Sequence, residues 1–331
     1  MSSQNSFTVI STFSGCGGSS LGYKMAGGKV LLAVEFDSHA VTTYRENFPE
    51  TLIYPRDIKT LTAEDAMKMA GVGPGELDIL DGSPPCQGFS TAGKRQLDDP
   101  RNSLFKEYVR LLVGLKPKVL IMENVPGMVR GKMKLVFAEI MEALKTAGYN
   151  VSARVLDAQY FGVPQRRKRM IFIGVRHDLG FRPTHPRPKT KPVTVGEALA
   201  GLPDDPSRTL SEQAYFYWLK VKPGQSFAKV HPKGHWFNGI KVDPTKVAPT
   251  IAKTSMPSGG GGGLYHWKYP RILNIAEAKR LCSFPDDFIL QGTFQEQWAR
   301  LGNSVPPLFM KAIAEHVRDT ILIPLRLKET G

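Results

Sequence analysis

Two short motifs place a thiol and a carboxylate directly after apolar segments of this chain. Pro85-Cys86-Gln87 follows the run Leu77–Leu80, and Glu123-Asn124-Val125 follows the run Val119–Met122. Ligands of open parallel sheets bind outside the carboxyl ends of the strands, so we expect both side chains at one functional edge. A cysteine that attacks and a carboxyl group that moves a proton suffice for covalent catalysis on an electron-poor ring. The alternative for Cys86 is an inert buried thiol, and its neighbours Pro85 and Gln87 argue against that role.

A glycine-rich turn follows the first predicted strand. Glycines at this place let the backbone approach a nucleotide-like ligand, although Ser20 replaces the third glycine of the dinucleotide fingerprint and a plain tight turn is the alternative. Glu35 ends the second predicted strand about 20 residues later, where an acid usually holds ribose hydroxyl groups. Phe36 offers a ring for stacking on adenine, and Asp57 offers an acceptor for the adenine amino group. A surface acid or a core aromatic residue is the alternative for each of these three.

The elements that must position these residues alternate along the first half of the chain. Strands are predicted for six apolar runs: Phe7–Thr12, Lys29–Glu35, Leu77–Leu80, Val119–Met122, Val151–Leu156 and Met170–Val175. Helical spacing of apolar residues predicts helices over Asn102–Leu115 and Lys134–Ala147. Strands that alternate with amphipathic helices predict a doubly wound α/β fold.

The pattern then changes. Residues 182–192 hold four prolines and are typical of a linker, and the sequence from about 193 to 258 is irregular and rich in proline. Five glycines at 259–263 indicate either a hinge or a recognition loop, and we favour the hinge. Helical patterns return at Ile275–Leu281 and Leu308–Ile323.

Charge points to a polyanionic partner. The 331 residues carry a formal net charge of +14, and residues 176–270 hold 14 lysine or arginine residues against 6 acidic ones. The same stretch contains three of the four tryptophans and five of the seven histidines. Basic residues interleaved with aromatic ones suit a surface that follows phosphates and contacts bases, and a generally basic protein without such a partner is the alternative.

The cysteines and the apolar runs further restrict the class of protein to which this chain can belong. The three cysteines Cys16, Cys86 and Cys282 are widely spaced, which argues against a disulfide framework and against a zinc site. The longest apolar runs have the length of strands, and the N-terminus lacks a signal-peptide pattern. We therefore expect no metal, no membrane and a cytoplasmic protein, associated with the nucleoid through its polyanionic partner.

Six motifs together resemble those of the DNA cytosine-5 methyltransferase family and follow that family's order over nearly the whole chain. They are Phe13-Ser14-Gly15-Cys16-Gly17-Gly18, Pro84-Pro85-Cys86-Gln87-Gly88-Phe89-Ser90, Glu123-Asn124-Val125, Gln165-Arg166-Arg167-Lys168-Arg169, Arg271 with Glu277 and Phe284-Pro285-Asp286, and Gly302-Asn303-Ser304-Val305-Pro306. The resemblance implies a Rossmann-like fold for methyl transfer from S-adenosyl-L-methionine, with a doubly wound mixed sheet and a smaller, irregular target-recognition domain. It further implies that double-stranded DNA is the substrate.

The resemblance also assigns roles to residues. Cys86 is expected to add to carbon 6 of a cytosine, Glu123 to hydrogen-bond ring nitrogen 3, and Arg167 and Arg169 to contact the cytosine carbonyl and to anchor Glu123; a solvated basic turn is the alternative for the arginines. The expected cofactor-binding residues are Phe13, Ser14, Gly15, Gly17, Gly18, Glu35, Phe36, Asp57, Ile58, Pro85, Leu104, Asn303, Ser304 and Val305. The expected DNA-binding residues are Gln87, Ser90, Lys94, Arg95, Gln165 and Thr250.

The implied organisation has three parts. Residues 1–185 and 290–331 form the catalytic and cofactor-binding domain, 186–270 the target-recognition domain, and 271–289 a supporting hinge. The base must leave the duplex to reach Cys86, and the polar segment 88–101 is expected to close over it. We expect a monomer of a restriction-modification system, paired in function with an endonuclease without a stable complex.

Three alternatives stay open from the sequence. A relative that acts on transfer RNA would carry a Cys-Phe-Thr tripeptide, which does not occur here. A DNA-binding protein without catalysis would not need Cys86 and Glu123. A cysteine hydrolase would need a histidine partner, and the two histidines outside the basic stretch, His39 and His316, have no supporting context.

Overall fold

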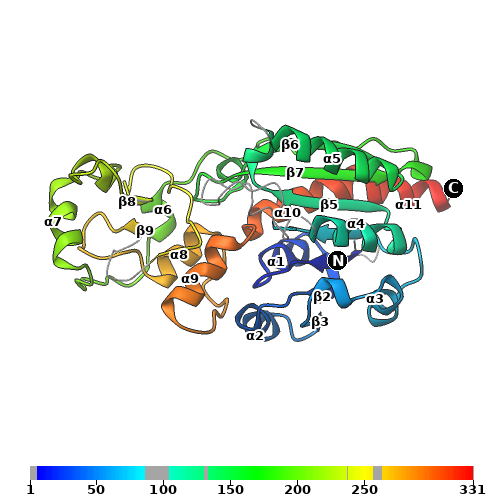
Figure 1. Ribbon diagram of the computed structural model, residues 1–331, viewed down its shortest axis with the longest axis horizontal. Coiled ribbons are helices and arrows are strands. Elements are labelled where there is room, and N and C mark those ends of the chain that lie inside the picture. The colour runs from blue at the N-terminus through cyan, green and yellow to red at the C-terminus, as the bar shows by residue number, and fades with distance from the viewer. Residues whose placement is uncertain (1–5, 86–103, 130–132, 237, 256–262, 331) are drawn as a thin grey trace. The chain divides into compact units, whose positions relative to one another are not determined.

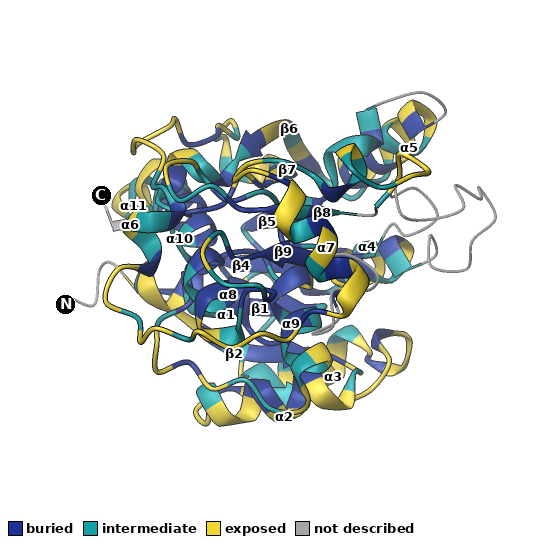
Figure 2. Cartoon of the chain, turned by 90° about the vertical axis from the view of Figure 1, so that its left-hand side faces the viewer, coloured by how far each residue is buried: buried dark blue, intermediate teal, exposed yellow. Residues whose placement is uncertain are grey.

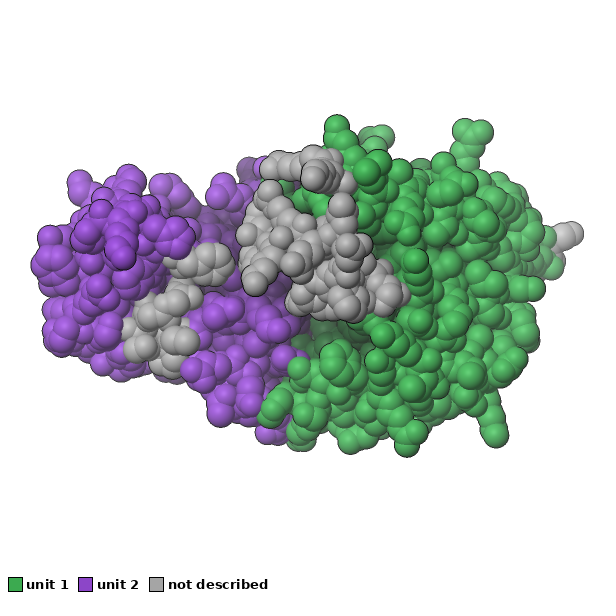
Figure 3. All heavy atoms as spheres, viewed as in Figure 1, with its two compact units in different colours: residues 1–156, 168–187, 310–331 green, residues 157–167, 188–309 purple. Residues whose placement is uncertain are grey.

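The computed structural model describes residues 6–85, 104–129, 133–236, 238–255 and 263–330. The chain divides into two compact units, coloured separately in Figure 3. Unit 1 contains residues 1–156, 168–187 and 310–331, and unit 2 contains residues 157–167 and 188–309.

A seven-stranded sheet forms the centre of unit 1, in the order β3-β2-β1-β4-β5-β7-β6 (Figure 1). The strands are β1 (Phe7–Thr12), β2 (Gly28–Val34), β3 (Leu52–Tyr54), β4 (Ile79–Gly82), β5 (Val119–Asn124), β6 (Tyr149–Asp157) and β7 (Lys168–Arg176). The pairs from β3 to β5 are parallel, and β7 runs antiparallel to β5. The predicted doubly wound mixed sheet is confirmed, and each predicted strand is found within two residues of its expected start and end.

Helices cover both faces of this sheet. They are α1 (Gly18–Met25), α2 (Ser38–Asn47), α3 (Ala63–Ala70), α4 (Leu104–Leu115), α5 (Met133–Thr146) and α11 (Ile323–Thr330), with α10 (Pro307–Val317) beginning in unit 2 and entering unit 1 at Met310. One apolar cluster joins α3, α4 and α5 to Ile10, Leu80 and Leu120 of the central strands. Figure 2 shows α4 and α5 on one side of β4 and β5, and α10 and α11 on the other.

Burial on both faces explains the continuous apolar runs of the central strands. Val119, Leu120, Ile121 and Met122 of β5 are all fully buried. Polar residues appear where these strands end at their carboxyl edge, so the edge is the place where this sheet exposes functional groups.

Unit 2 is built from short elements. Its helices are α6 (Val195–Leu199), α7 (Glu212–Lys220), α8 (Ile275–Leu281) and α9 (Phe294–Asn303), and β8 (Gly239–Lys241) pairs in parallel with β9 (Gly263–Tyr265). Aromatic rings pack at its centre, where Phe227 stacks on Tyr265 with ring centroids 4.0 Å apart and Trp236 donates a hydrogen bond to the Tyr265 hydroxyl. The rings that the sequence placed among basic residues therefore serve partly as core.

Three helices of unit 2 were not predicted, namely α6 and α7 in the proline-rich part and α9 after it. The side chain of Thr194 and that of Glu197 form a capping box that starts α6, and Ser211 caps α7. Helix α8 has the predicted bounds. Within the described residues, none of the helices combines the length and the apolar character that a membrane crossing requires.

Candidate active site

The carboxyl ends of β4 and β5 lie side by side in register. Leu80 pairs with Leu120 and Gly82 with Met122, so Pro84 and Glu123 leave neighbouring strands at the same edge. The side chain of Asn124 donates a hydrogen bond to the carbonyl oxygen of Pro84 at 3.1 Å. Asn124 is 4% exposed and fixes the backbone that leads to Pro85 and Cys86, although Cys86 itself lies outside the described residues.

Glu123 is held by an arginine at this edge. Arg169 Nε lies 2.6 Å from Glu123 Oε1, and the two side chains are 14% and 12% exposed. Ile171 of β7 pairs with Glu123 of β5, so Arg169, two residues before Ile171, projects from the same face of the sheet as Glu123. A charge-assisted hydrogen bond between partly buried groups orients the carboxyl group strongly.

Arg167 has a different environment, in unit 2. Its guanidinium group is 1% exposed and donates to the carbonyl oxygens of Ile251, Gly302 and Ser304 at 2.8–3.1 Å. Gln165 is fully buried, and its side chain accepts from the Ile251 amide and donates to the carbonyl oxygen of Leu281. These two side chains connect segments of unit 2 that are distant in sequence.

Thr250 lies next to this network. Its hydroxyl donates to the carbonyl oxygen of Arg166 at 2.6 Å, and the residue is half-buried. Asn303 is exposed, Ser304 is half-buried and Val305 is buried, and all three belong to unit 2.

Part of the predicted cofactor-binding set in unit 1 lines one cavity of about 170 Å³. It is lined by Phe13, Val34, Glu35, Phe36, Arg56, Asp57, Ile58, Lys59 and Leu104. Six of these residues were predicted from the sequence. Val34, Arg56 and Lys59 were missed, and their position beside Glu35 and Asp57 was the available signal.

Glu35 organises the turn at this cavity. Its carboxylate accepts hydrogen bonds from the amides of Gly15, Phe36 and Asp37 at 2.8–2.9 Å. Burial raises the pKa of Glu35, while these backbone N–H groups act in the opposite direction. A carboxylate has about four acceptor positions, so one remains for a ligand.

The turn itself requires glycine at Gly17. Gly17 has φ of +95°, and a Cβ atom there would lie 2.3 Å from Phe48 Cε2. Phe13 and Gly15 also have positive φ, each of 55°. Ser14 donates through both its amide and its hydroxyl to the carbonyl oxygen of Val34, and Gly18 begins α1, so the turn packs closely on the end of β2.

The other walls of the cavity are chemically distinct. Phe36 exposes 70% of its surface, which is unusual for a large apolar residue. Asp57 is exposed and accepts from the Lys59 amide, while Ile58 is buried. An exposed ring, two acids and apolar walls form a set that suits an adenosine group.

Several predicted residues cannot be placed in this site. Gln87, Ser90, Lys94 and Arg95 lie outside the described residues, as does the whole segment 88–101. Pro85 is described and half-buried, directly before Cys86.

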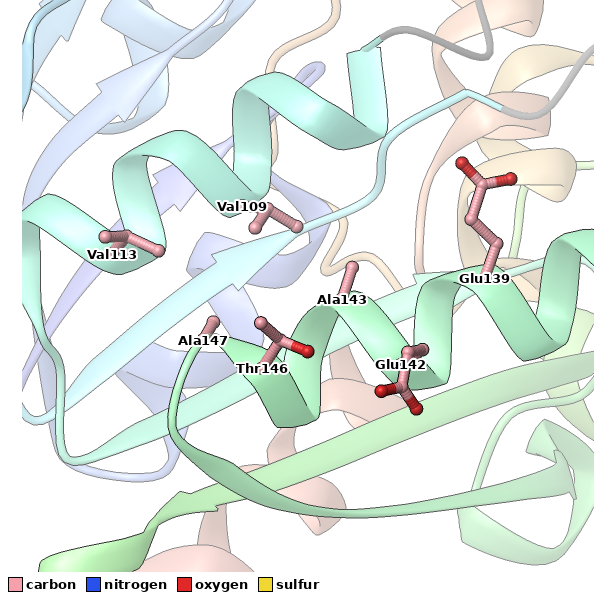
Figure 4. Close-up of a pocket in the computed structure, with 7 residues that line it drawn as sticks. All are labelled: Val109, Val113, Glu139, Glu142, Ala143, Thr146 and Ala147. Carbon is pink, nitrogen blue, oxygen red and sulfur yellow. The ribbon is translucent and has the colours of Figure 1, made fainter.

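A larger hollow of about 470 Å³ lies elsewhere, between α4 and α5 (Figure 4). Its walls are Val109, Val113, Ala143, Thr146 and Ala147 with Glu139 and Glu142. Among the predicted site residues that the structure describes, none lines this hollow. The described residues with predicted chemical roles lie instead at the smaller cavity and at the strand ends.

Comparisons with known proteins agree with this geometry. A family model described as C-5 cytosine-specific DNA methylase matches residues 7–319. The Type II methyltransferase M1.HphI of Haemophilus parahaemolyticus is 38% identical over 94% of this chain and 87% of its own length. The Type II methyltransferase M.XorII of Xanthomonas oryzae is 32% identical over 94% of this chain and 84% of its own length.

One solved structure is similar over almost its whole length. It is a candidate DNA modification methyltransferase encoded within a prophage of E. coli, with a TM-score of 0.80 and 27% sequence identity. The similarity covers 96% of this chain and 99% of the other.

Proposed function

This chain belongs to the C-5 cytosine-specific DNA methylase family and is a DNA cytosine-5 methyltransferase of the Type II restriction-modification kind, and from that premise we propose that it methylates a flipped-out cytosine through a covalent adduct with Cys86. The observation that carries the proposal is the pairing of Glu123 with Arg169 at the carboxyl edge of the sheet, beside the strand that leads to Cys86. A carboxyl group fixed beside this strand supports the role of a proton donor to the base.

The residues around the cavity at the ends of β1, β2 and β3 support binding of the adenosine part of S-adenosyl-L-methionine. Phe36 would stack on the adenine, Asp57 would accept from its amino group, and Glu35 would accept from ribose hydroxyl groups. Phe13, Ile58 and Leu104 would supply the apolar walls, and Ser14, Gly15, Gly17 and Gly18 the close backbone. When bound, the cofactor supplies the methyl group that carbon 5 receives. Contacts from Pro85, Asn303, Ser304 and Val305 are part of the same proposal.

The chain's own residues prepare the base. The Cys86 thiolate forms a bond to carbon 6 with its lone pair, electrons of the ring move toward nitrogen 3, and the Glu123 carboxyl group gives its proton to that nitrogen. Carbon 5 becomes nucleophilic as a result. After methyl transfer, carbon 5 gives its proton to water, the electrons of that bond form the double bond between carbons 5 and 6, and the bond from sulfur to carbon 6 breaks, which regenerates the thiolate. Nitrogen 3 then returns its proton to the Glu123 carboxylate.

The two arginines have separate roles in this proposal. Arg169 orients Glu123 and stabilises charge as it develops on the cytosine. Arg167 positions the segments around Ile251 and Ser304, because it donates three hydrogen bonds to backbone carbonyl groups of unit 2.

DNA recognition is assigned to residues 186–270, supported by the exposed lysines of unit 2. Lys220, Lys222, Lys229 and Lys233 are exposed around an aromatic core, an arrangement that suits contact with phosphates. Gln87, Ser90, Lys94, Arg95, Gln165 and Thr250 complete the proposed DNA-contacting set. The enzyme acts as a monomer and shares its target site with an endonuclease that it does not bind stably.

Trapping tests the covalent step. Duplex DNA with 5-fluorocytosine at the target should form an adduct that survives denaturation, because the carbon 5 position then carries no proton to lose. The substitution Cys86→Ala should abolish both the adduct and methyl transfer, while cofactor binding is kept. Full methyl transfer by Cys86→Ala would refute the mechanism.

The recognition assignment has its own test. Bisulfite sequencing of DNA from cells that express the chain identifies the target cytosine. Replacing the exposed lysines of unit 2 with glutamine should weaken DNA binding at every sequence, and its dependence on salt should become less steep. Unchanged binding in all four variants would contradict the assignment.

A further inference from the structure

One wall of the cavity proposed for the cofactor is an exposed turn. Asp57 precedes the short 3-10 helix Ile58–Thr60, and Asp57, Lys59 and Thr60 are all exposed. Hydrogen bonds within the turn give it its shape. The Lys59 amide donates to Asp57 Oδ1 at 3.0 Å, and the Thr60 amide donates to the Asp57 carbonyl oxygen at 2.9 Å. These bonds are internal, so they fix the shape of the turn and not its place on the protein.

Ile58 joins this turn to the body of unit 1 through its side chain and through its carbonyl oxygen. The side chain is 4% exposed and belongs to the apolar cluster that connects α3, α4 and α5 with the central strands. The carbonyl oxygen accepts a hydrogen bond at 3.0 Å from Nη2 of Arg110 in α4. Apolar packing is not directional, whereas a hydrogen bond from a planar donor group also fixes the orientation of the turn.

The guanidinium group of Arg110 is itself held in place. Its Nε donates to Oε2 of Glu107 at 2.8 Å, one turn earlier on the same helix. Because the guanidinium group is planar and rigid, a bond that fixes Nε also directs the Nη groups. Glu107 therefore helps to aim Arg110 at the Ile58 carbonyl group.

Helix α4 gives this hydrogen bond a rigid base. Tyr108, Leu111 and Leu112 are fully buried in the apolar cluster, and the Tyr108 hydroxyl donates to the carbonyl oxygen of Leu80 in β4 at 3.1 Å. Leu104, the first residue of α4, lines the same cavity as the turn. One helix thus supplies a wall of the cavity and holds the turn that forms another wall.

We propose that Arg110 is a positioning residue that determines specificity for the adenine of the cofactor: it holds the Ile58 carbonyl group and thereby keeps the Asp57 carboxylate where the adenine amino group can donate to it. The inference rests on the proposed function, in which Asp57 accepts from that amino group. It gives a role to a side chain outside the cavity lining.

A positioning role and a general structural role differ in which ligands are affected. If Arg110 only stabilised the fold around the cavity, its loss would weaken every ligand of the cavity to the same extent. If Arg110 positions Asp57, its loss weakens only ligands that carry the amino group, because a turn that samples several orientations forms the hydrogen bond less often.

Calorimetry with two ligands separates these cases. The ligands are S-adenosyl-L-homocysteine, the product of methyl transfer, and its 6-deamino analogue, in which hydrogen replaces the adenine amino group. The wild type should bind the product about tenfold more tightly than the analogue, because the analogue cannot donate to the ionised acceptor. In Arg110→Met, which keeps an apolar stem, the ratio should fall to about twofold, while affinity for the analogue stays within about twofold of the wild type.

The outcomes are distinct. An Arg110→Met protein that keeps the wild-type ratio would overturn the inference, and so would an equal loss of affinity for both ligands. A wild type that binds the two ligands equally would instead refute the contact between Asp57 and the amino group in the proposed function, and the inference with it.

Lys106→Met is the matched control. Lys106 lies on α4 one turn before Arg110, is exposed, and makes no hydrogen bond or ion pair with any residue that the structure describes. Its replacement removes the same charge from the same helix, and the ratio of the two affinities should stay at the wild-type value. A ratio that falls as in Arg110→Met would attribute the effect to charge alone and would overturn the inference.

A double-mutant cycle tests whether Arg110 acts through Asp57. Asp57→Ala removes the proposed acceptor and should weaken binding of the product about tenfold. Adding Arg110→Met to Asp57→Ala should cause no further loss, because the two substitutions remove the same hydrogen bond. Losses that multiply in the double variant would show that the two residues act independently, which would overturn the inference.

Discussion

Replacing Asp81 with asparagine is expected to stabilise unit 1, by an amount that depends on pH. The pKa of Asp81 rises from an ordinary 3.8 to about 7 in the folded state, mainly through burial. Between these values the folded state binds more protons than the unfolded chain, so the free energy of unfolding falls as pH rises and levels off above about pH 7. Three pKa units correspond to about 4 kcal/mol.

Asparagine is neutral at every pH and removes this dependence. Relative to the wild type, the free energy of unfolding of Asp81→Asn should increase by about 2.5 kcal/mol between pH 5 and pH 8. His185 acts in the opposite direction, because burial lowers its pKa from 6.5 to about 4 and the unfolded state binds the extra proton. Both proteins contain His185, so its contribution cancels in the difference.

Unit 1 needs a probe of its own. All four tryptophans, Trp218, Trp236, Trp267 and Trp298, lie in unit 2, so their fluorescence would report the wrong transition. Hydrogen exchange measured by mass spectrometry on peptides from β1 and β4 reports opening of the sheet around Asp81. Intrinsic exchange rates cancel when the two proteins are compared at the same pH.

The expected signal is large. The exchange rate of the wild type divided by that of Asp81→Asn should increase nearly a hundredfold between pH 5 and pH 8 in these peptides. Ser11→Ala removes a hydrogen bond that lowers the pKa of Asp81, so its transition should move to higher pH. A ratio that stays constant from pH 5 to pH 8 would refute the assignment of a buried, titrating carboxyl group.

Three further substitutions test the site. Phe36→Ala should weaken binding of S-adenosyl-L-methionine about tenfold by calorimetry and leave thermal stability unchanged, whereas Phe36→Trp should keep the affinity. Gly17→Ala should destabilise the protein by about 2–4 kcal/mol in chemical denaturation, because of the contact with Phe48, whereas Gly15→Ala should cost about 1 kcal/mol because no atom of the described residues lies within 4 Å of the added Cβ. Arg169→Lys should slow methyl transfer about 10–100-fold with unchanged cofactor affinity, since lysine lacks the planar donors that hold Glu123; equal rates would refute the role of this ion pair.

The central sheet could be predicted because its strands are buried on both faces. Such strands are continuous apolar runs, and the runs at Val119–Met122 and Met170–Val175 lie within β5 and β7 as predicted. The short helices α6 and α7 of unit 2 were not predicted, because the proline-rich composition of their part of the chain indicated irregular structure. Thr194 and Glu197 have the spacing of a capping box, which was the local signal for α6.

The different environments of Arg167 and Arg169 could not be predicted from spacing. The two residues are separated by one position, and either guanidinium group could reach a carboxylate on a neighbouring strand. The start of β7 at Lys168 separates them, because Arg169 then follows the alternation of Ile171, the register partner of Glu123. Arg167 precedes the strand and belongs to unit 2. Only the register of an antiparallel pair, which depends on the whole sheet, distinguishes the two arginines.

Asn124 was missed for a related reason. Its neighbour Glu123 carries the chemistry, and nothing in the sequence shows that the Asn124 amide reaches the Pro84 carbonyl group 40 residues earlier. Alternation along β5 sends the two side chains to opposite faces, so Glu123 can pair with Arg169 while Asn124 fixes the backbone at Pro84, two residues before Cys86. In the proposed reaction, Glu123 donates the proton, and its neighbour Asn124 holds the backbone that precedes the nucleophile Cys86.

Asp81 was a signal in the sequence that could have been used, because it interrupts the apolar run of a central strand. A carboxyl group in a central parallel strand conflicts with every local expectation for that strand, and such conflicts concentrate at functional or strained sites. The structure compensates with two hydroxyl donors, yet these do not bring the pKa back to its ordinary value. A purely structural position would be served better by an apolar residue, because a buried carboxyl group that ionises near neutral pH lowers stability there.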